Sequence, residues 1–206
     1  MSSDLQLRIN QASNSARENN INSDELVKLL NDCIDHNLDH SISHELLDLA
    51  HLSSVSKSIA NSNCQELWLD KLVQLIKKSN YNFGILLKQR ADFYDEENAI
   101  TIIKNGHLQS ISYSTLWEKI INIAKALSHF EKFSKPVVIG LLTNNQINGS
   151  LIDLACLSFG IKVVPIPLNS TSQHVSYIID HAEITHLFIG GKTGVKLWSD
   201  IKAIHT

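Results

Sequence analysis

Three short apolar runs alternate with two helix-like segments between residues 137 and 190, and this order strongly constrains the fold. The runs are VVIGLL, IKVVPI and THLFIG, and the segments between them are INGSLIDLACLSF and SQHVSYIIDHA. A run that is apolar at nearly every position is typical of a strand covered on both faces, as in a parallel sheet. Strand–helix–strand–helix–strand order predicts right-handed crossovers. We therefore predict an α/β fold with a doubly wound, mostly parallel sheet.

Two of the three prolines, Pro165 and Pro167, stand at the end of the second run. Because proline cannot donate to a sheet ladder, this position predicts a strand that ends at the carboxyl edge of the sheet. Residues 143–145 leave the neighbouring strand at the same edge. Ligands of open α/β sheets bind at that edge, so any site is expected near these loops. The alternative is a rigid exit loop without a ligand, since most loop residues are connectors.

The segment AITIIKNGHLQSISY contains two strand-like runs joined by Asn105 and Gly106. Both residues tolerate the positive φ of a type I′ turn, so the segment predicts a β-hairpin. Ser114 is expected to cap the helix that follows, and either Ser170 or Thr171 to cap the helix before the third run.

Glycine and proline are distributed unevenly along the chain. The first 83 residues contain neither, whereas all eight glycines and all three prolines lie beyond them. This shift predicts two regions. Residues 1–80 form an all-helical N-terminal region, a possible docking appendage with a protein partner, and residues 81–206 carry the α/β part.

Helices are expected at four places in the N-terminal part of the chain. Ser23 is expected to cap the first, a second is expected over about residues 43–60, and the segments CQELWLDKLVQLIKKS and FGILLKQRADFY follow as the third and fourth. The first twenty residues are polar and are expected to be frayed or disordered.

The composition excludes several classes of function. The formal net charge of −3 argues against a nucleic-acid-binding protein, and no apolar run approaches the 18 residues of a transmembrane segment. The first residues lack the apolar core of a signal peptide. Cys33, Cys64 and Cys156 are too few for a disulfide framework and are interpreted as reduced thiols. We expect a cytoplasmic protein.

A partial nucleotide-binding motif occurs at Gly191, Lys192 and Thr193, directly after the third run. A phosphate-binding P-loop requires a further glycine where His186 stands. Without that glycine, a flexible surface turn is the favoured interpretation.

A partial metal-binding pattern occurs in the first region. His36, His40 and His44 recur at helical spacing near Cys33, and His44 begins a zinc-protease-like motif whose second histidine is replaced by Asp48. A closed zinc site needs four convergent ligands, and the segment NLDHSIS indicates a break between two helices. Solvated histidines are the favoured interpretation. No nucleophile elbow occurs, and we assign no catalytic, cofactor-binding or metal-ligating residue.

The order of these parts resembles the adenylate-forming (AMP-binding) superfamily, which includes acyl-CoA synthetases, luciferases and adenylation domains. The segment NFGILLKQRADFYDEENAITII is similar to the opening helix of that family, with an Arg-Ala pair at Arg90 and Ala91 and a strand that begins near Ala99. The segment ISYSTLWEKIINIAKAL is similar to its Thr-Tyr-x-Glu-Leu segment, although Thr115 replaces the usual acidic residue.

The resemblance continues to about residue 195. Gly160, Val164 and Pro165 match the glycine and the Val-Pro strand end of the family. The second proline, Pro167, and the helix HVSYIIDHAE make the N-terminal part of long-chain fatty-acyl-CoA synthetases the most similar subgroup.

The resemblance implies an ATP-dependent acid–thiol ligase that activates a carboxylate, a fatty acid, as an acyl-adenylate. ATP, Mg²⁺ and coenzyme A would serve the parent enzyme. The phosphate loop and catalytic lysine of the family lie downstream of the matched region, so we expect a fragment that requires the remainder of the synthetase. Alone, it is expected to be inactive and to bind none of these cofactors.

Two alternatives remain. The chain is a non-catalytic interaction or docking module on the same scaffold, or residues 190–194 make it a self-contained nucleotide-binding domain.

Overall fold

The computed structural model describes residues 2–36, 40–104, 106–132 and 136–204. The chain divides into two compact units, Met1–Leu86 and Leu87–Thr206, which we call the helical unit and the α/β unit. Over the described residues, the chain forms a helix-rich α/β structure with a small three-stranded parallel sheet. None of the described helices is both long enough and apolar enough to cross a bilayer.

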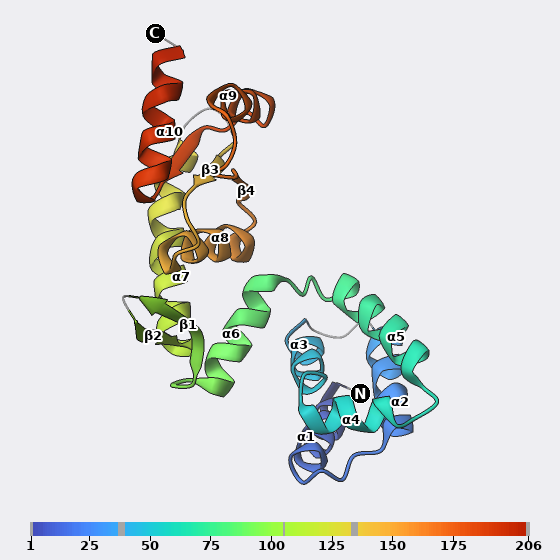
Figure 1. The fold of residues 1–206 in the computed structure, drawn as a ribbon. Helices are drawn as coiled ribbons and strands as arrows, with labels where there is room; N and C mark the ends of the chain where they lie inside the picture. Colours follow the sequence, from blue (N-terminus) through green and yellow to red (C-terminus); the bar gives the residue numbers. More distant parts are fainter. Residues whose placement is uncertain (1, 37–39, 105, 133–135, 205–206) are drawn as a thin grey trace. The chain divides into compact units, whose positions relative to one another are not determined.

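The helical unit consists of a series of short helices around one leucine-rich core (Figure 1). Leu30 and Leu46 are fully buried at its centre. Its helices are α1 (Ser2–Arg17), α2 (Ser23–Asp35), α3 (His40–Leu49), α4 (Ser53–Ala60) and α5 (Gln65–Lys78), and α6 (Phe83–Tyr94) leads into the α/β unit.

The prediction that the first twenty residues are frayed or disordered is wrong. Residues 2–17 form α1, and Leu5, Ile9 and Ala16 are almost completely buried in the core. These residues recur at spacings of four and seven along one face of the helix. The helical spacing of these apolar residues therefore determines the structure of the segment, although its average composition is polar.

Two helix boundaries also differ from the prediction. The N-cap of α2 is Asn22, whose side chain accepts from the backbone N–H of Asp24 at 2.9 Å, rather than Ser23. The single helix predicted over residues 43–60 is two helices, α3 and α4, which are separated at residues 50–52. No glycine or proline marks that break, so composition could not reveal it.

The α/β unit begins with a two-stranded antiparallel ribbon formed by β1 (Asn98–Lys104) and β2 (His107–Ser112). The predicted turn includes Asn105, which lies outside the described residues, and Gly106 has φ +78°. The next helix is α7 (Tyr113–Ser128), followed by the 3₁₀ turn η1 (His129–Lys132). The N-cap of α7 is Ser112, whose side chain accepts from the backbone N–H of Thr115. The prediction of Ser114 as the cap is therefore wrong by two residues.

The sheet has three strands in the order β4–β3–β5, and both neighbouring pairs are parallel. This confirms the prediction of same-direction strands on either side of Gly160. That glycine ends the helix before β4 in the left-handed conformation, φ +71°, and Thr171 caps the helix before β5. The elements are β3 (Val138–Leu142), α8 (Ile147–Phe159), β4 (Lys162–Pro165), α9 (Ser172–His181), β5 (His186–Ile189) and α10 (Gly191–Ile204).

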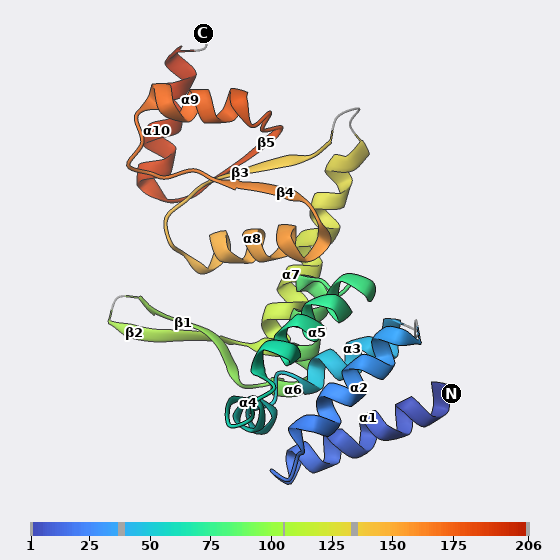
Figure 2. The same cartoon turned by 90° about the vertical axis from the view of Figure 1, so that its right-hand side faces the viewer.

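Helices cover both faces of this sheet (Figure 2). Ile139 and Leu141 of β3 pack in one cluster with Cys156 of α8. Leu142 packs in another cluster with Val175 of α9 and with residues of α10. Successive strand residues point to opposite faces, and helices cover both faces, so β3 is buried along its whole length.

Candidate functional site

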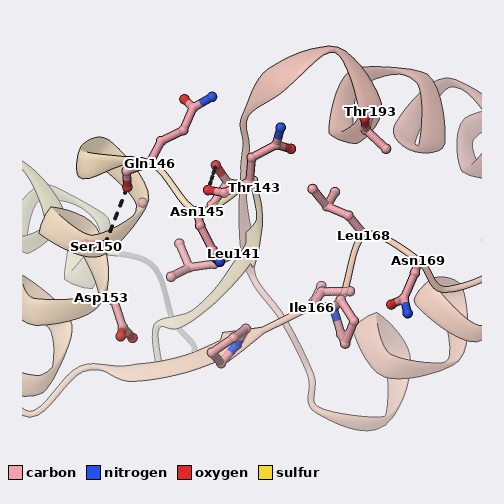
Figure 3. Close-up of a pocket in the computed structure, with 14 residues that line it drawn as sticks. Leu141, Thr143, Asn145, Gln146, Ser150, Asp153, Ile166, Leu168, Asn169 and Thr193 are labelled. Carbon is pink, nitrogen blue, oxygen red and sulfur yellow. Dashed lines mark hydrogen bonds between the residues drawn. The ribbon is translucent and has the colours of Figure 1, made fainter. Parts of the chain in front are cut away.

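An open cavity of about 710 Å³ lies where β3 and β4 end, at the carboxyl edge of the sheet (Figure 3). Its lining includes residues 143–146 after β3, residues 165–169 after β4, and Thr193 near the start of α10. These first two segments are the loops that the sequence identified. The cavity therefore stands where open α/β sheets bind ligands.

The segment with two prolines forms one wall of this cavity. Pro165 is the last residue of β4 and pairs with Leu141. The N–H of Ile166 then donates to the carbonyl oxygen of Leu141 at 2.8 Å, and the Ile166 side chain is 3% exposed. Pairing with β3 thus ends between the prolines, and the buried isoleucine fixes the exit loop.

The opposite wall, the loop after β3, is packed against glycines. An added Cβ at Gly149 would lie 2.8 Å from Cγ2 of Thr143, and one at Gly190 would overlap Oγ1 of Thr143. An added Cβ at Gly191 would lie 2.9 Å from Oδ1 of Asn144. Only residues without a side chain permit this close approach, so the glycines hold the loop in place.

This packing also explains the partial nucleotide motif. Residues 191–193 begin helix α10, so the prediction of a flexible surface turn is wrong. Gly191 has φ +73° and makes room for Asn144. Thr193 lines the cavity.

The face of α8 that lines the cavity was missed by the sequence analysis. Gln146, Gly149, Ser150 and Asp153 all belong to the lining. Their spacing of three, four and seven residues is that of one helix face, so the period of α8 could have identified them once the edge was chosen.

The chemistry of the lining is that of neutral hydrogen-bonding groups. Amides and hydroxyls predominate, and among the described lining residues Asp153 is the one carboxylate and none is basic. Nearby Cys156 lies outside the lining, and burial, with a smaller contribution from Asp153, raises the pKa of its thiol to about 11. The described lining can orient a ligand but presents no nucleophile activated by a base.

The histidines of the helical unit do not form a metal site among the described residues. The Ser79 carbonyl oxygen accepts from Nδ1 of His40 at 2.6 Å and from Nε2 of His44 at 2.8 Å. Because Ser79 is the C-cap of α5, these rings tie α3 to the end of α5. His40 remains exposed, as the interpretation of solvated side chains predicts, whereas His44 is half-buried. The predicted helix break lies partly at residues 37–39, outside the described residues.

Comparisons with known proteins relate the α/β unit to one family of enzymes. The family model "AMP-binding enzyme" matches residues 87–205. No curated protein matches the chain.

Two solved structures share the fold at low sequence identity. The inhibitor-bound N-terminal domain of FACL13 from Mycobacterium tuberculosis is 20% identical, with a TM-score of 0.52 over 59% of this chain and 30% of that chain. A Mycobacterium tuberculosis fatty acyl CoA synthetase is also 20% identical, with a TM-score of 0.52 over 59% of this chain and 24% of that chain. The chain thus spans less than a third of either structure. Since the family model covers more than half of the residues, the chain belongs to the AMP-binding enzyme family.

Proposed function

We propose that the chain is the N-terminal part of an ATP-dependent ligase that activates a carboxylate, a fatty acid, as an acyl-adenylate. The observation that carries this proposal is the family match over residues 87–205. In the proposed reaction, a carboxylate oxygen attacks the α-phosphorus of ATP and pyrophosphate leaves. The thiol of coenzyme A then attacks the acyl carbon, and AMP leaves.

The three-stranded sheet is proposed to be one portion of a larger doubly wound sheet, with the β1–β2 ribbon as its hairpin. β3 is buried throughout, whereas the outer strands β4 and β5 are partly exposed. Outer strands present unpaired backbone groups, which further strands of the ligase would pair. The similar structures extend far beyond the matched region, which supports this proposal.

The cavity at the carboxyl edge is proposed to form one wall of the substrate site. Its described lining has a single carboxylate and no cation, so it does not by itself fit a Mg²⁺–triphosphate group. We therefore route no step of ATP chemistry through these residues. Their amides and hydroxyls would orient neutral parts of the substrate, while the remainder of the ligase neutralises the phosphates.

The test is carboxylate-dependent exchange of pyrophosphate into ATP. We expect exchange with fatty acids for the protein that joins this chain to the remainder of a ligase, and none for the 206-residue chain alone. If no carboxylate, from acetate to long-chain fatty acids, supports exchange by the joined protein, the proposed function is wrong.

A matched pair of variants tests the role of the cavity. Asp153→Asn removes the one carboxylate of the described lining, so we expect the KM for the acid substrate to fall about two- to fivefold, as like-charge repulsion is lost. Asp180→Asn on α9 makes the same change outside the lining and should leave KM unchanged. Equal effects of both variants would contradict the assignment of the wall.

A second candidate function is a docking module, because the helical unit is compact by itself and lies outside the family match. Residues 1–80 would then bind a protein partner. Calorimetric titration separates the candidates: no heat with ATP–Mg²⁺ or a fatty acid, together with tight binding of a protein, favours docking. The free thiols of all three cysteines support the cytoplasm as the proposed compartment.

A further inference from the structure

Helix α5 has a wider apolar face than its contacts within the helical unit use. Trp68 and Leu75 are buried in the core of the unit, and α5 lies beside α2 (Figure 1). The uncovered part of the same face is formed by Leu69, Val73 and Ile76, which are 61%, 47% and 37% exposed. At about 100° per residue, the apolar arc from Leu75 to Val73 spans about 160°, against roughly 100° for a helix with one covered face.

Charges of opposite sign flank the uncovered part of this arc. Glu66 and Asp70 lie toward the N-terminal end of α5, and Lys77 lies toward its C-terminal end. All three fall on one side of the arc, within about 40° of one another around the helix. Lys78 is on the opposite side, where its Nζ donates to the carbonyl oxygen of Ile34 at 2.9 Å. One flank is therefore acidic at one end and basic at the other.

The apolar positions are complementary to themselves in the antiparallel direction. The register that sets Leu69 opposite Ile76 of a second copy also sets Val73 opposite Leu72, which is half-buried against the core of the helical unit. A two-fold axis repeats both pairs, so each of these four residues meets an apolar partner.

The same register matches the charges. Lys77 comes level with position 68 of the second copy, which is about 3 Å along the helix axis from both Glu66 and Asp70. In a parallel pair this flank would instead face the opposite flank of the second copy, so Lys77 would not meet Glu66 or Asp70. The charges therefore select one occupant and one direction.

We propose that α5 binds the α5 helix of a second copy of this chain in an antiparallel pair. The pair covers the exposed leucine, valine and isoleucine side chains and brings each Lys77 beside two acids. This self-association is independent of the proposed ligase activity. An interface of one helix pair belongs to the small, weak class, so dissociation in the micromolar range is expected.

Sedimentation velocity of the full chain over about 5–500 μM tests the proposal, since this range brackets a weak dimer. The wild-type chain should change from monomer to dimer. Val73→Glu places a charge at the centre of the face and should raise the dissociation constant at least about tenfold. Lys57→Glu, an exposed lysine on α4, makes a charge reversal elsewhere and should change nothing. Circular dichroism checks that each variant is folded.

A charge-exchange experiment tests the direction of pairing. Lys77→Glu alone, and Glu66→Lys with Asp70→Lys alone, should each raise the dissociation constant about two- to fivefold or more. An equimolar mixture of the two variant chains should restore wild-type dimerisation as a heterodimer, because every charged contact is again between opposite signs.

Three outcomes would overturn the proposal. A wild-type chain that stays monomeric at the highest concentration excludes it. A dimer that Val73→Glu leaves intact uses another surface. Failure of the mixed charge variants to form heterodimers excludes the antiparallel register.

Discussion

The helical unit and the α/β unit bury their apolar side chains in different ways. The helical unit collects its buried residues from α1–α5 in one continuous cluster. The α/β unit distributes them over separate clusters, two of which contain residues of β3 and lie on opposite faces of the sheet. A third joins the β1–β2 ribbon to α7 and α8.

The difference also appears at the edges of each core. A helix pairs most of its backbone groups within itself, whereas an outer strand of a sheet leaves one row of backbone groups without a strand partner. The outer strands β4 and β5 of the sheet remain partly exposed. We infer that the first unit is built as a self-contained body and the second as a portion of a larger sheet.

Reactivity of the thiols is expected to show the largest effect, between the half-buried and the buried cysteines. Cys33 in the helical unit and Cys156 in the α/β unit are buried, whereas Cys64 is half-buried. At pH 8 Cys64 should react with a thiol reagent about a thousandfold faster than either buried thiol, which must wait for opening. In rising urea, peptide mass spectrometry should find different midpoints of labelling for Cys33 and Cys156. A shared midpoint would mean that the units unfold together.

The same thiols predict a pH dependence. Burial, followed by the charge of Asp32 for Cys33 and of Asp153 for Cys156, raises the pKa of each from 9.0 to about 11. The native state therefore holds these protons more tightly than the unfolded chain. Their contribution to stability is complete below pH 9 and is lost as the pH rises from 9 through 11. In urea titrations at rising pH, the Cys33→Ala and Cys156→Ala variants should each lose less free energy of unfolding between pH 9 and 11 than the wild-type chain loses.

Matched truncations in the two cores should have the next largest effect. Leu30 and Leu142 are both fully buried, one in each unit. Each substitution by alanine should lower the free energy of unfolding by about 2–5 kcal/mol. Trp68 reports on the helical unit, and in a Trp68→Phe background the remaining tryptophans report on the α/β unit. If the two units unfold independently, each truncation should shift only the unfolding transition of its own unit. A truncation that shifts both transitions would contradict independent unfolding.

The architecture of the α/β unit could be predicted from sequence because its signals are local. Apolar runs, the glycine at Gly160 and the two prolines at the end of β4 each mark a boundary within a few residues. The two loops at the cavity followed from the strand ends. The helical unit offers fewer such marks, so the cap of α2 was misplaced by one residue and the break between α3 and α4 was not predicted.

What sequence could not supply depends on contacts between distant residues. The packing of Gly190 against Thr143 joins positions 47 residues apart, and no local pattern indicates it. The orientation of Asp153 toward the cavity depends on which face of α8 meets the sheet. The burial of α1 likewise depends on a core formed by later helices.

Close approach to a glycine backbone is a feature of the α/β unit, since the first 83 residues contain no glycine. Gly190→Ala would push a methyl group into Thr143 and should cost about 1–3 kcal/mol by overpacking. In a Thr143→Ala background the cost should be smaller, because the overlapping Oγ1 is gone. A double-mutant cycle in urea measures this coupling. Additive costs would show that the loop does not rest on this contact.

The smallest expected effect concerns how helices end in each unit. After α5, Asn80 has φ +53°, and the N–H of Tyr81 donates to the carbonyl oxygen of Ile76. The end of α9 has the same geometry: Glu183 has φ +53°, and the N–H of Ile184 donates to the carbonyl oxygen of Ile179. Asparagine tolerates this left-handed conformation better than glutamate. Glu183→Gly should therefore raise the free energy of unfolding by about 0.5–1 kcal/mol, while Asn80→Gly should change it by no more than a few tenths. Glu183→Ala removes the side chain but keeps the backbone strain, so it should not raise the free energy of unfolding. If alanine raises it as much as glycine does, the glutamate side chain rather than the backbone conformation limits stability.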